Sequence, residues 1–146
     1  MSEGTWTLHA QLAADTVAVG ELALSRVLAV NAADYPWLIL VPRRAGASEI
    51  ADLGADAFPL MAEIALVSLT LKEVTQCDKI NVAALGNMMP QLHVHIVARC
   101  KTDPQWPNSV FGAPPPRADD AQVFARFVAT MREKLGVPAV AQSSPG

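Results

Sequence analysis

The segment 91–99, QLHVHIVAR, holds two of the three histidines of this chain. Its composition favours β-structure, and successive side chains of a strand point to opposite faces. Gln91, His93 and His95 therefore share one face, with neighbours roughly 6.5 to 7 Å apart along the strand. Imidazoles titrate near neutral pH and act as nucleophiles or as metal ligands. This row of a carboxamide and two imidazoles suits attack on a phosphate or the binding of a metal ion.

A metal site on His93 and His95 needs a third protein ligand, because zinc sites use at least three. Cys100 is expected on the opposite face of the strand, and His9 lies far away in sequence, in a segment where we expect it to have a structural role. The sequence offers no convincing third ligand. We therefore predict no metal site and no required cofactor.

The composition predicts one compact domain. The 146 residues are 51% hydrophobic and 17% charged, which favours a single core. A net charge of -3 gives no general attraction to nucleic acid or to an anionic membrane. The start of the chain lacks a leader pattern and no long apolar run is present, so we expect a cytoplasmic protein with no membrane partner. Cys77 and Cys100 are expected to be free thiols.

Alternating and apolar runs place the strands that must position the histidines. The sequence predicts short strands over 5–9, 16–19 and 22–30, a central strand over 36–42 that is buried on both faces, and antiparallel strands over 79–85 and 91–100. Five prolines between residues 101 and 117 predict an ordered but irregular arm.

Two helices are predicted from apolar residues that recur with a helical period. Between residue 59 and about residue 76, apolar side chains recur every three or four positions, which predicts a helix with one buried face. Met61, Ala65 and Leu69 are expected to widen that apolar stripe. A final helix over about 118–136 begins with acidic residues and ends at a glycine.

At the histidine strand the sequence resembles the histidine triad (HIT) family, whose signature is three histidines alternating with apolar residues. His95 is followed by two apolar residues, a small residue and Arg99, as in the family, which fixes the register. In this register His95 and His93 match the third and the middle histidine, and Gln91 stands in place of the first. The resemblance covers roughly residues 20 to 112, and the diadenosine polyphosphate hydrolase-like branch is the one suggested.

The resemblance implies an α+β fold with an HIT-like antiparallel sheet of about five strands, one long helix and a C-terminal helix. A single domain over 1–146 is expected, with its core at about 5–112, the C-terminal helix at about 118–136 and a frayed tail at 139–146. The resemblance also implies a homodimer whose sheets join, and a nucleotide bound near the histidine strand.

In such enzymes the middle histidine attacks the α-phosphorus of a nucleotide and forms a nucleotidyl-imidazole that water hydrolyses. The resemblance gives this role to His93, which then needs a hydrogen bond from its other ring nitrogen to a carbonyl oxygen. His95, Gln91, Asn87 and amides of the loop at Gly86 would bind the phosphate oxygens. The expected activity is a nucleotide hydrolase or nucleotidyl transferase that acts on a dinucleoside polyphosphate or a nucleoside phosphoramidate. A divalent cation is expected only together with a polyphosphate substrate.

Further polar residues have two interpretations each. Asn31 and Asp34 lie where the family places a ribose-binding side chain, or they form a solvated turn. Asn81 either belongs to the site or is a strand asparagine that forms a hydrogen bond to a loop. Asn87 binds phosphate, or only forms a turn. Trp106 closes over the site of a partner subunit, or anchors the proline-rich arm by burying its ring.

Two less specific interpretations of the histidines stay open. In the first, His93 and His95 are ordinary sheet histidines with no role in catalysis. In the second, the protein is a non-catalytic nucleotide-binding or sensing module. Gln91 keeps the second one open, because a carboxamide can donate and accept hydrogen bonds and so contact phosphate, but cannot carry charge or transfer a proton. Arginines at strand ends, such as Arg99, are expected to be solvated.

Overall fold

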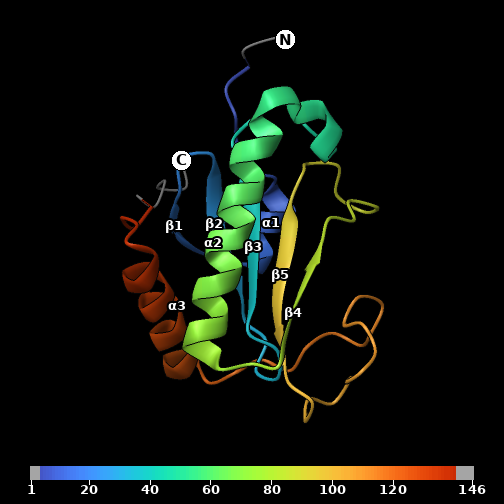
Figure 1. Cartoon of the computed structure of the whole chain (residues 1–146), viewed down its shortest axis with the longest axis vertical. Helices are drawn as coiled ribbons and strands as arrows, with labels where there is room; N and C mark the ends of the chain where they lie inside the picture. The colour runs from blue at the N-terminus through green and yellow to red at the C-terminus, as the bar shows by residue number, and fades with distance from the viewer. Residues whose placement is uncertain (1–3, 141–146) are drawn as a thin grey trace.

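The computed structural model describes residues 4–140, which form a five-stranded antiparallel sheet with helices on both faces (Figure 1). The strands are β1 (Val17–Glu21), β2 (Ser25–Val30), β3 (Trp37–Pro42), β4 (Lys79–Ala83) and β5 (Val94–Arg99), in the spatial order β1-β2-β3-β5-β4. The helices are α1 (Ala10–Asp15), the 3-10 helix η1 (Ile50–Asp56), α2 (Ala57–Thr75) and α3 (Ala121–Leu135). The α+β prediction is confirmed. Most of the predicted tail, residues 141–146, lies outside the described residues.

Strand β3 lies at the centre of the sheet, between β2 and β5. Its residues 38–42 are all buried, because one face packs on α2 and the other on α1. Strand β5 is antiparallel to both of its neighbours, so that His95 pairs with Ile39 on β3 and with Ala83 on β4. The histidine strand is therefore held on both sides by backbone hydrogen bonds.

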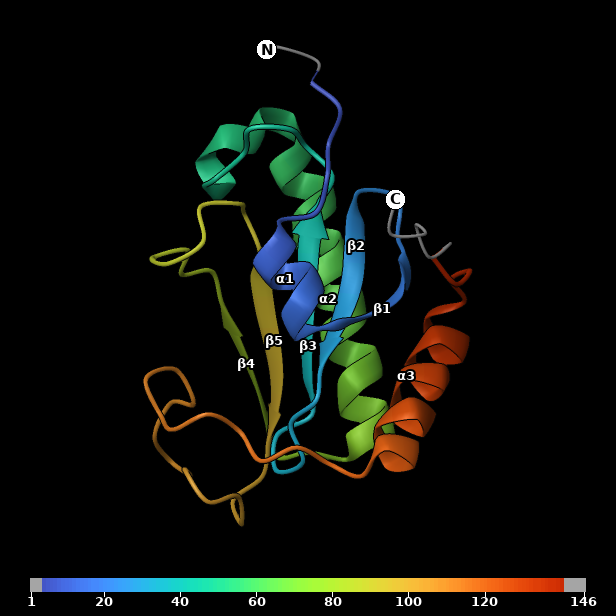
Figure 2. The ribbon, with the colours of Figure 1, turned by 180° about the vertical axis from the view of Figure 1, so that it is seen from behind.

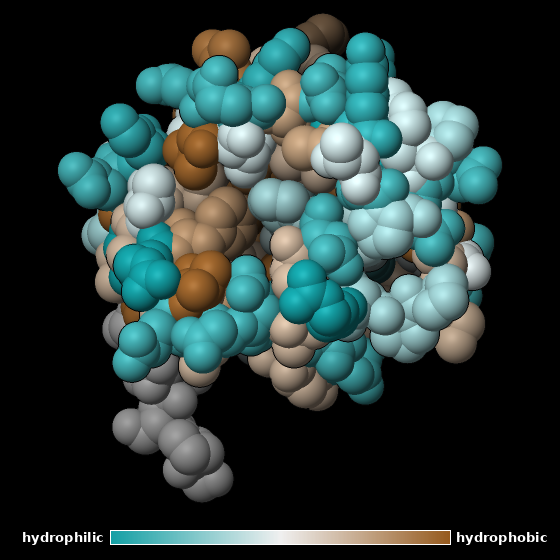
Figure 3. Space-filling model, turned by 90° about the horizontal axis from the view of Figure 1, so that it is seen from below, coloured by the Kyte–Doolittle hydropathy of each residue, from teal (hydrophilic) through white to brown (hydrophobic). Residues whose placement is uncertain are grey.

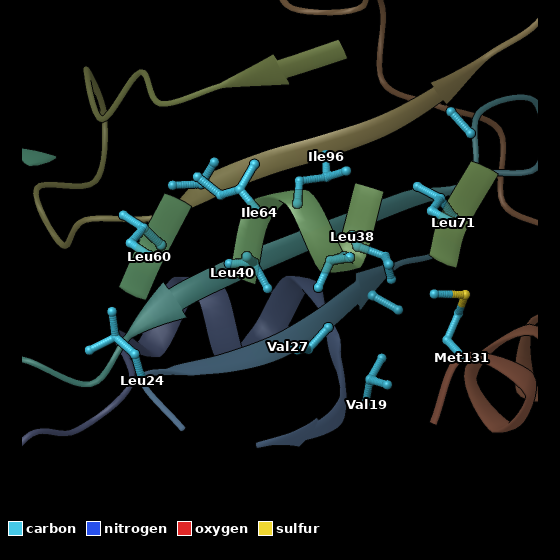
Figure 4. Packing of buried hydrophobic residues seen from close by; sticks show 14 of the residues in the cluster. Val19, Leu24, Val27, Leu38, Leu40, Leu60, Ile64, Leu71, Ile96 and Met131 are labelled. Atoms are coloured by element: carbon cyan, nitrogen blue, oxygen red, sulfur yellow. The ribbon is translucent and has the colours of Figure 1, made fainter. Parts of the chain in front are cut away.

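Helix α2 crosses one face of the sheet (Figure 1). Leu60, Ile64 and Leu71 point from it toward Leu38 and Ile96 of the sheet, as Figure 4 shows. Pro59 lies in its first turn, where the missing N–H costs no hydrogen bond. The side chains expected to widen the buried stripe are instead exposed, Met61 to 61% and Leu69 to 68%. The predicted helix is confirmed, and the predicted width of its buried face is wrong.

Helix α3 packs beside α2 and β1 through Val128 and Met131. The Asp120 carboxylate accepts the N–H groups of Gln122 and Val123 and so caps the first turn. Gly136 ends the helix in the left-handed region, with φ at 66°. Among the described residues, no helix combines the length and the apolar content needed to cross a bilayer. Cys77 and Cys100 are free cysteines, as expected.

The other face of the sheet is covered by α1 and by the segment that precedes it (Figure 2). The strand predicted over 5–9 is wrong, because these residues form no regular structure. Their alternation arises because Trp6 and Leu8 pack against the sheet while their neighbours face solvent. His9 instead caps α1, its Nδ1 accepting the N–H of Gln11 at 3.1 Å.

Candidate active site

The start of β5 brings His93 and His95 together. Their ring centroids are 5.0 Å apart, with an angle of 76° between the planes. The strand was predicted from residue 91 but begins at Val94, so His93 immediately precedes the ladder and His95 lies within it. His93 is 5% exposed, and His95 is partly buried. The two imidazoles thus form one compact group at the end of a rigid strand.

The ring of His93 is oriented by the backbone of Gln91. Its Nδ1 lies 2.7 Å from the Gln91 carbonyl oxygen. A carbonyl oxygen only accepts, so Nδ1 carries the proton, and Nε2 of the neutral ring keeps its lone pair. This is the hydrogen bond to a carbonyl oxygen that a nucleophilic histidine requires.

His95 has the opposite arrangement. The indole Nε1–H of Trp37 donates to its Nδ1 at 3.1 Å, so the proton of the neutral ring lies on Nε2. Phe111 packs against the same ring, with centroids 5.0 Å apart. Burial, and secondly the proximity of His93, lowers the pKa of His95 to about 4. At neutral pH this ring is uncharged and can donate a hydrogen bond through Nε2.

The side chain of Gln91 binds the N-terminal segment. Its Oε1 accepts the backbone N–H of His9, and its Nε2 donates to the carbonyl oxygen of Thr7, both at 2.8 Å. The carboxamide donor expected to contact phosphate is therefore already engaged. Sequence reasoning missed Thr7 because no local pattern connects residues more than 80 positions apart.

Asn87 and Asn81 lie in different surroundings. Asn87 is exposed in the loop before β5, next to Gly86, whose φ of 69° is in the left-handed region. Asn81 lies on β4 opposite Val97, and its Oδ1 accepts a hydrogen bond from Arg99 at 3.0 Å. A direct substrate contact stays a prediction for Asn87. For Asn81 the structure favours the interpretation as a strand asparagine with a structural partner.

Asn31 and Asp34 connect the end of β2 to the segment that leads to α3. The Asn31 Oδ1 accepts the N–H of Asp119 at 2.8 Å, and Asp34 forms an ion pair with Arg117 at 3.0 Å. A cavity of about 180 Å³ beside Asn31 is otherwise mostly apolar. It lies at the end of the molecule seen in Figure 3, where apolar surface shows in a hollow among hydrophilic residues. Ribose binding by these two residues stays a prediction.

Trp106 belongs to a buried cluster around Arg99. The guanidinium carbon of Arg99 lies 5.8 Å from the Trp106 ring centroid and 5.6 Å from that of Tyr35. Asp103 pairs with Arg99 at 2.8 Å, and both side chains are 1% exposed. The expectation of a solvated Arg99 is wrong, because Asp103 compensates its charge inside the fold. These contacts show Trp106 anchoring the proline-rich arm within its own chain.

Trp37 and Phe111 are the site residues that sequence reasoning missed. Trp37 was assigned only to a buried strand, yet the register that pairs Ile39 with His95 places Trp37 diagonally across from it. The pairing of these two strands could have been predicted from the sequence, because both strands were predicted. Phe111 lies in the irregular arm, whose path no periodicity reveals.

Among the described residues, His93 and His95 have no neighbouring side chain that completes a metal site. Within residues 4–140, no group of three or more His, Cys, Asp or Glu side chains is placed to hold a metal ion. A cavity of about 360 Å³ lies elsewhere, between residues 44–47 and η1. The chemistry available at the start of β5 is therefore that of the imidazoles and their hydrogen-bond partners.

Comparison with known proteins shows the family. The HIT domain model matches residues 11–102, so the chain belongs to the HIT family. A histidine triad protein from Bradyrhizobium japonicum is 50% identical, with a TM-score of 0.87 over 90% of this chain and 99% of that one. Histidine triad proteins from Marinobacter aquaeolei and Sinorhizobium meliloti are 42% and 39% identical, with TM-scores of 0.86 and 0.85. They cover 91% and 89% of this chain, and 98% and 97% of their own. No curated protein matches the chain.

Proposed function

We propose that this protein is a nucleotide hydrolase or nucleotidyl transferase that forms a nucleotidyl intermediate on His93. The observation that carries the proposal is the hydrogen bond from Nδ1 of His93 to the Gln91 carbonyl oxygen, which leaves Nε2 with its lone pair. Nε2 forms a bond to the α-phosphorus, and the bond to the leaving group breaks with its electron pair. The leaving group takes up a proton from solvent. Water then attacks the phosphorus, loses a proton, and releases the nucleoside monophosphate and the neutral ring.

His95 is the proposed donor to the phosphate. Its Nε2–H can bind a non-bridging oxygen and stabilise the charge that develops there. The lowered pKa keeps this ring neutral, so it contributes a hydrogen bond rather than a positive charge. Asn87 and the amides near Gly86 are proposed as further donors.

The distribution of cations bears on the leaving group. All 11 lysines and arginines of the sequence lie within the described residues. Five arginines pair with carboxylates: Arg26 and Arg43 with Glu21, Arg44 with Asp56, Arg99 with Asp103, and Arg117 with Asp34. Lys79 and Lys101 flank the far end of β5, whereas the cations of α2 and α3 belong to the opposite face.

A polyphosphate leaving group carries several negative charges that the protein must compensate. Because five arginines are already paired with carboxylates, they are not free to compensate these charges. This favours a weakly charged leaving group, as in a nucleoside phosphoramidate, over a dinucleoside polyphosphate. A dinucleoside polyphosphate, the substrate of the hydrolase-like branch, would need a divalent cation bound to its phosphates.

A second candidate function is nucleotide binding without turnover. His93 is only 5% exposed and the Gln91 amide is engaged by the N-terminal segment, so fewer groups are free for phosphate chemistry. In this case the protein would bind nucleotide and release it unchanged.

The partner that we propose is a second copy of the chain. Phe58, Met61 and Leu69 lie on the outward side of α2 with exposures of 80%, 61% and 68%. The outer edge of β4 has no neighbouring strand within the described residues, and Val82 on it is 47% exposed. A homodimer that covers this helix face and joins the sheets at β4 would remove both from water.

The test uses the purified, metal-stripped full chain with adenine and guanine phosphoramidates and dinucleotides. We expect turnover that His93→Ala abolishes, while its circular dichroism spectrum stays that of the wild type. His95→Ala should weaken both binding and rate. Tight binding of nucleotide with no product from any member of the panel would favour the binding module. Equal turnover by the wild type and His93→Ala would exclude the proposed nucleophile.

A further inference from the structure

We infer that Trp37 is a positioning residue, whose indole N–H holds His95 in the neutral form protonated at Nε2. The catalytic consequence rests on the proposed function, but the effect on the His95 ring does not. The indole donates to Nδ1 of His95 across a distance of 3.1 Å. Trp37 itself would not touch the substrate in this role.

The contact is built into the sheet. Trp37 begins β3 and pairs with Val97, and Ile39 pairs with His95, so Trp37 and His95 are diagonal neighbours on adjacent strands. Their rings meet edge-on, with an angle of 71° and centroids 5.7 Å apart. Phe111 packs against the indole with centroids 5.6 Å apart and against His95 as well. These contacts restrict rotation of both rings.

The chemistry of the two groups fixes the position of the proton. An indole nitrogen only donates, so the nitrogen of His95 that faces it must be unprotonated. A neutral imidazole has one proton, which then lies on Nε2 of His95. Protonation of Nδ1 would place two N–H donors against each other and break the contact. The titratable group in ring contact with His95 is His93, and the strand neighbours Ile39 and Ala83 carry no charge.

The two histidines thereby receive opposite roles from two fixed partners. The Gln91 carbonyl makes Nε2 of His93 an acceptor, and the Trp37 indole makes Nε2 of His95 a donor. A nucleophile and a donor to the phosphate are the two functions that attack on phosphorus requires. If the proton of His95 moved to Nδ1, its Nε2 would present a lone pair to the phosphate oxygen and repel it.

The test compares Trp37→Phe, which keeps an aromatic ring but removes the N–H, with the matched variant Trp6→Phe. Trp6 packs on the same face of the sheet, and its indole N–H has no hydrogen-bond partner among the described residues. Long-range ¹H–¹⁵N spectra of the histidine rings in the full chain report which nitrogen is protonated. We expect His95 in the wild type and in Trp6→Phe to be protonated only at Nε2 at neutral pH.

In Trp37→Phe we expect a measurable population protonated at Nδ1. The protonation midpoint of His95 should rise by about 0.5 to 1 pH unit, because the hydrogen bond that stabilises the neutral ring is lost. The kcat should fall by about threefold to tenfold, with a smaller change in KM, because part of the donor function is lost.

A wild-type spectrum with His95 protonated at Nδ1 would overturn the inference without any variant, which covers the case that Trp37→Phe does not fold. An unchanged protonation pattern in folded Trp37→Phe would overturn it too. A changed pattern with an unchanged kcat would exclude the positioning role. Absence of turnover in the wild type would contradict the proposed function, and the spectra would still decide how Trp37 acts on His95.

Discussion

Gln91 binds His93 through its main chain and the N-terminal segment through its side chain. Its carbonyl oxygen accepts Nδ1–H of His93 at 2.7 Å, and its carboxamide binds the main chain of Thr7 and His9. A carboxamide presents a donor and an acceptor side by side, which matches a C=O and an N–H two residues apart on an extended chain. An imidazole has its two nitrogens on different sides of the ring. The Gln91 side chain therefore has a structural role, which is to hold the N-terminal segment.

Replacement of Gln91 by alanine should release the N-terminal segment. Two hydrogen bonds are lost, which we expect to lower the free energy of unfolding by about 1–3 kcal/mol. Amide hydrogen exchange of residues 5–12 should accelerate more than that of β3. Gln122→Ala is the matched control, because this residue is exposed on the first turn of α3. Unchanged protection of residues 5–12 in Gln91→Ala would show that the carboxamide does not hold the segment.

The stability of the fold should decrease in mild acid because of His95. Its pKa is about 4 in the folded chain against 6.5 as the ordinary value. As the pH falls, His95 takes up a proton in the unfolded chain before it does so in the folded chain. The contribution of the neutral ring to the free energy of unfolding is therefore complete above pH 6.5 and is lost as the pH falls toward 4. It amounts to at most about 3 kcal/mol. Urea unfolding at pH 7 and pH 4.5 measures it, and His95→Gln should show a smaller pH dependence. The same dependence in both proteins would contradict a depressed pKa.

Removal of Asp103 should destabilise the protein strongly. Asp103→Ala leaves the Arg99 guanidinium buried without its counter-ion, at a cost of about 3–5 kcal/mol. Denaturant unfolding measures the loss. The comparison is Arg117→Ala, which breaks an exposed pair with Asp34 and should change stability little. Equal effects of the two substitutions would mean that burial of the Arg99 pair does not matter.

A charge on the outward side of α2 should dissociate the proposed homodimer. Leu69→Asp places a carboxylate at a position that is 68% exposed in the single chain, so the fold should persist while association is lost. Arg126→Asp on the exposed side of α3 is the control. Sedimentation velocity should show dimer for the wild type and the control, and monomer for Leu69→Asp. A monomeric wild type would refute the dimer.

The sheet and the two long helices were predictable because each repeats a simple pattern. The run 36–42 is apolar on both faces, and β3 is the central strand. The period of three to four residues over 59–76 corresponds to α2. The strand expected over 5–9 was not distinguishable from extended chain, because packing of Trp6 and Leu8 on a sheet gives the same alternation as a paired strand.

The histidine site was predictable as a pair but not in its surroundings. Spacing alone places His93 and His95 on one face at the start of β5. The partners that fix their protons, the Gln91 carbonyl and the Trp37 indole, depend on main-chain geometry and strand register, which local spacing does not contain. Asn31 and Asn81 carry groups that suit a ligand or a distant segment equally well, and only the folded chain shows Asp119 and Arg99 beside them.

Trapping of the covalent intermediate tests the central claim most directly. The wild type is mixed with a nucleoside phosphoramidate, quenched at alkaline pH within one turnover, digested and analysed by mass. A nucleotidyl group on the peptide that contains His93, absent from His93→Ala and slower to form in His95→Ala, is the predicted result. A nucleotidyl group on a different residue, or full turnover with no modified peptide in any quench, would contradict the account.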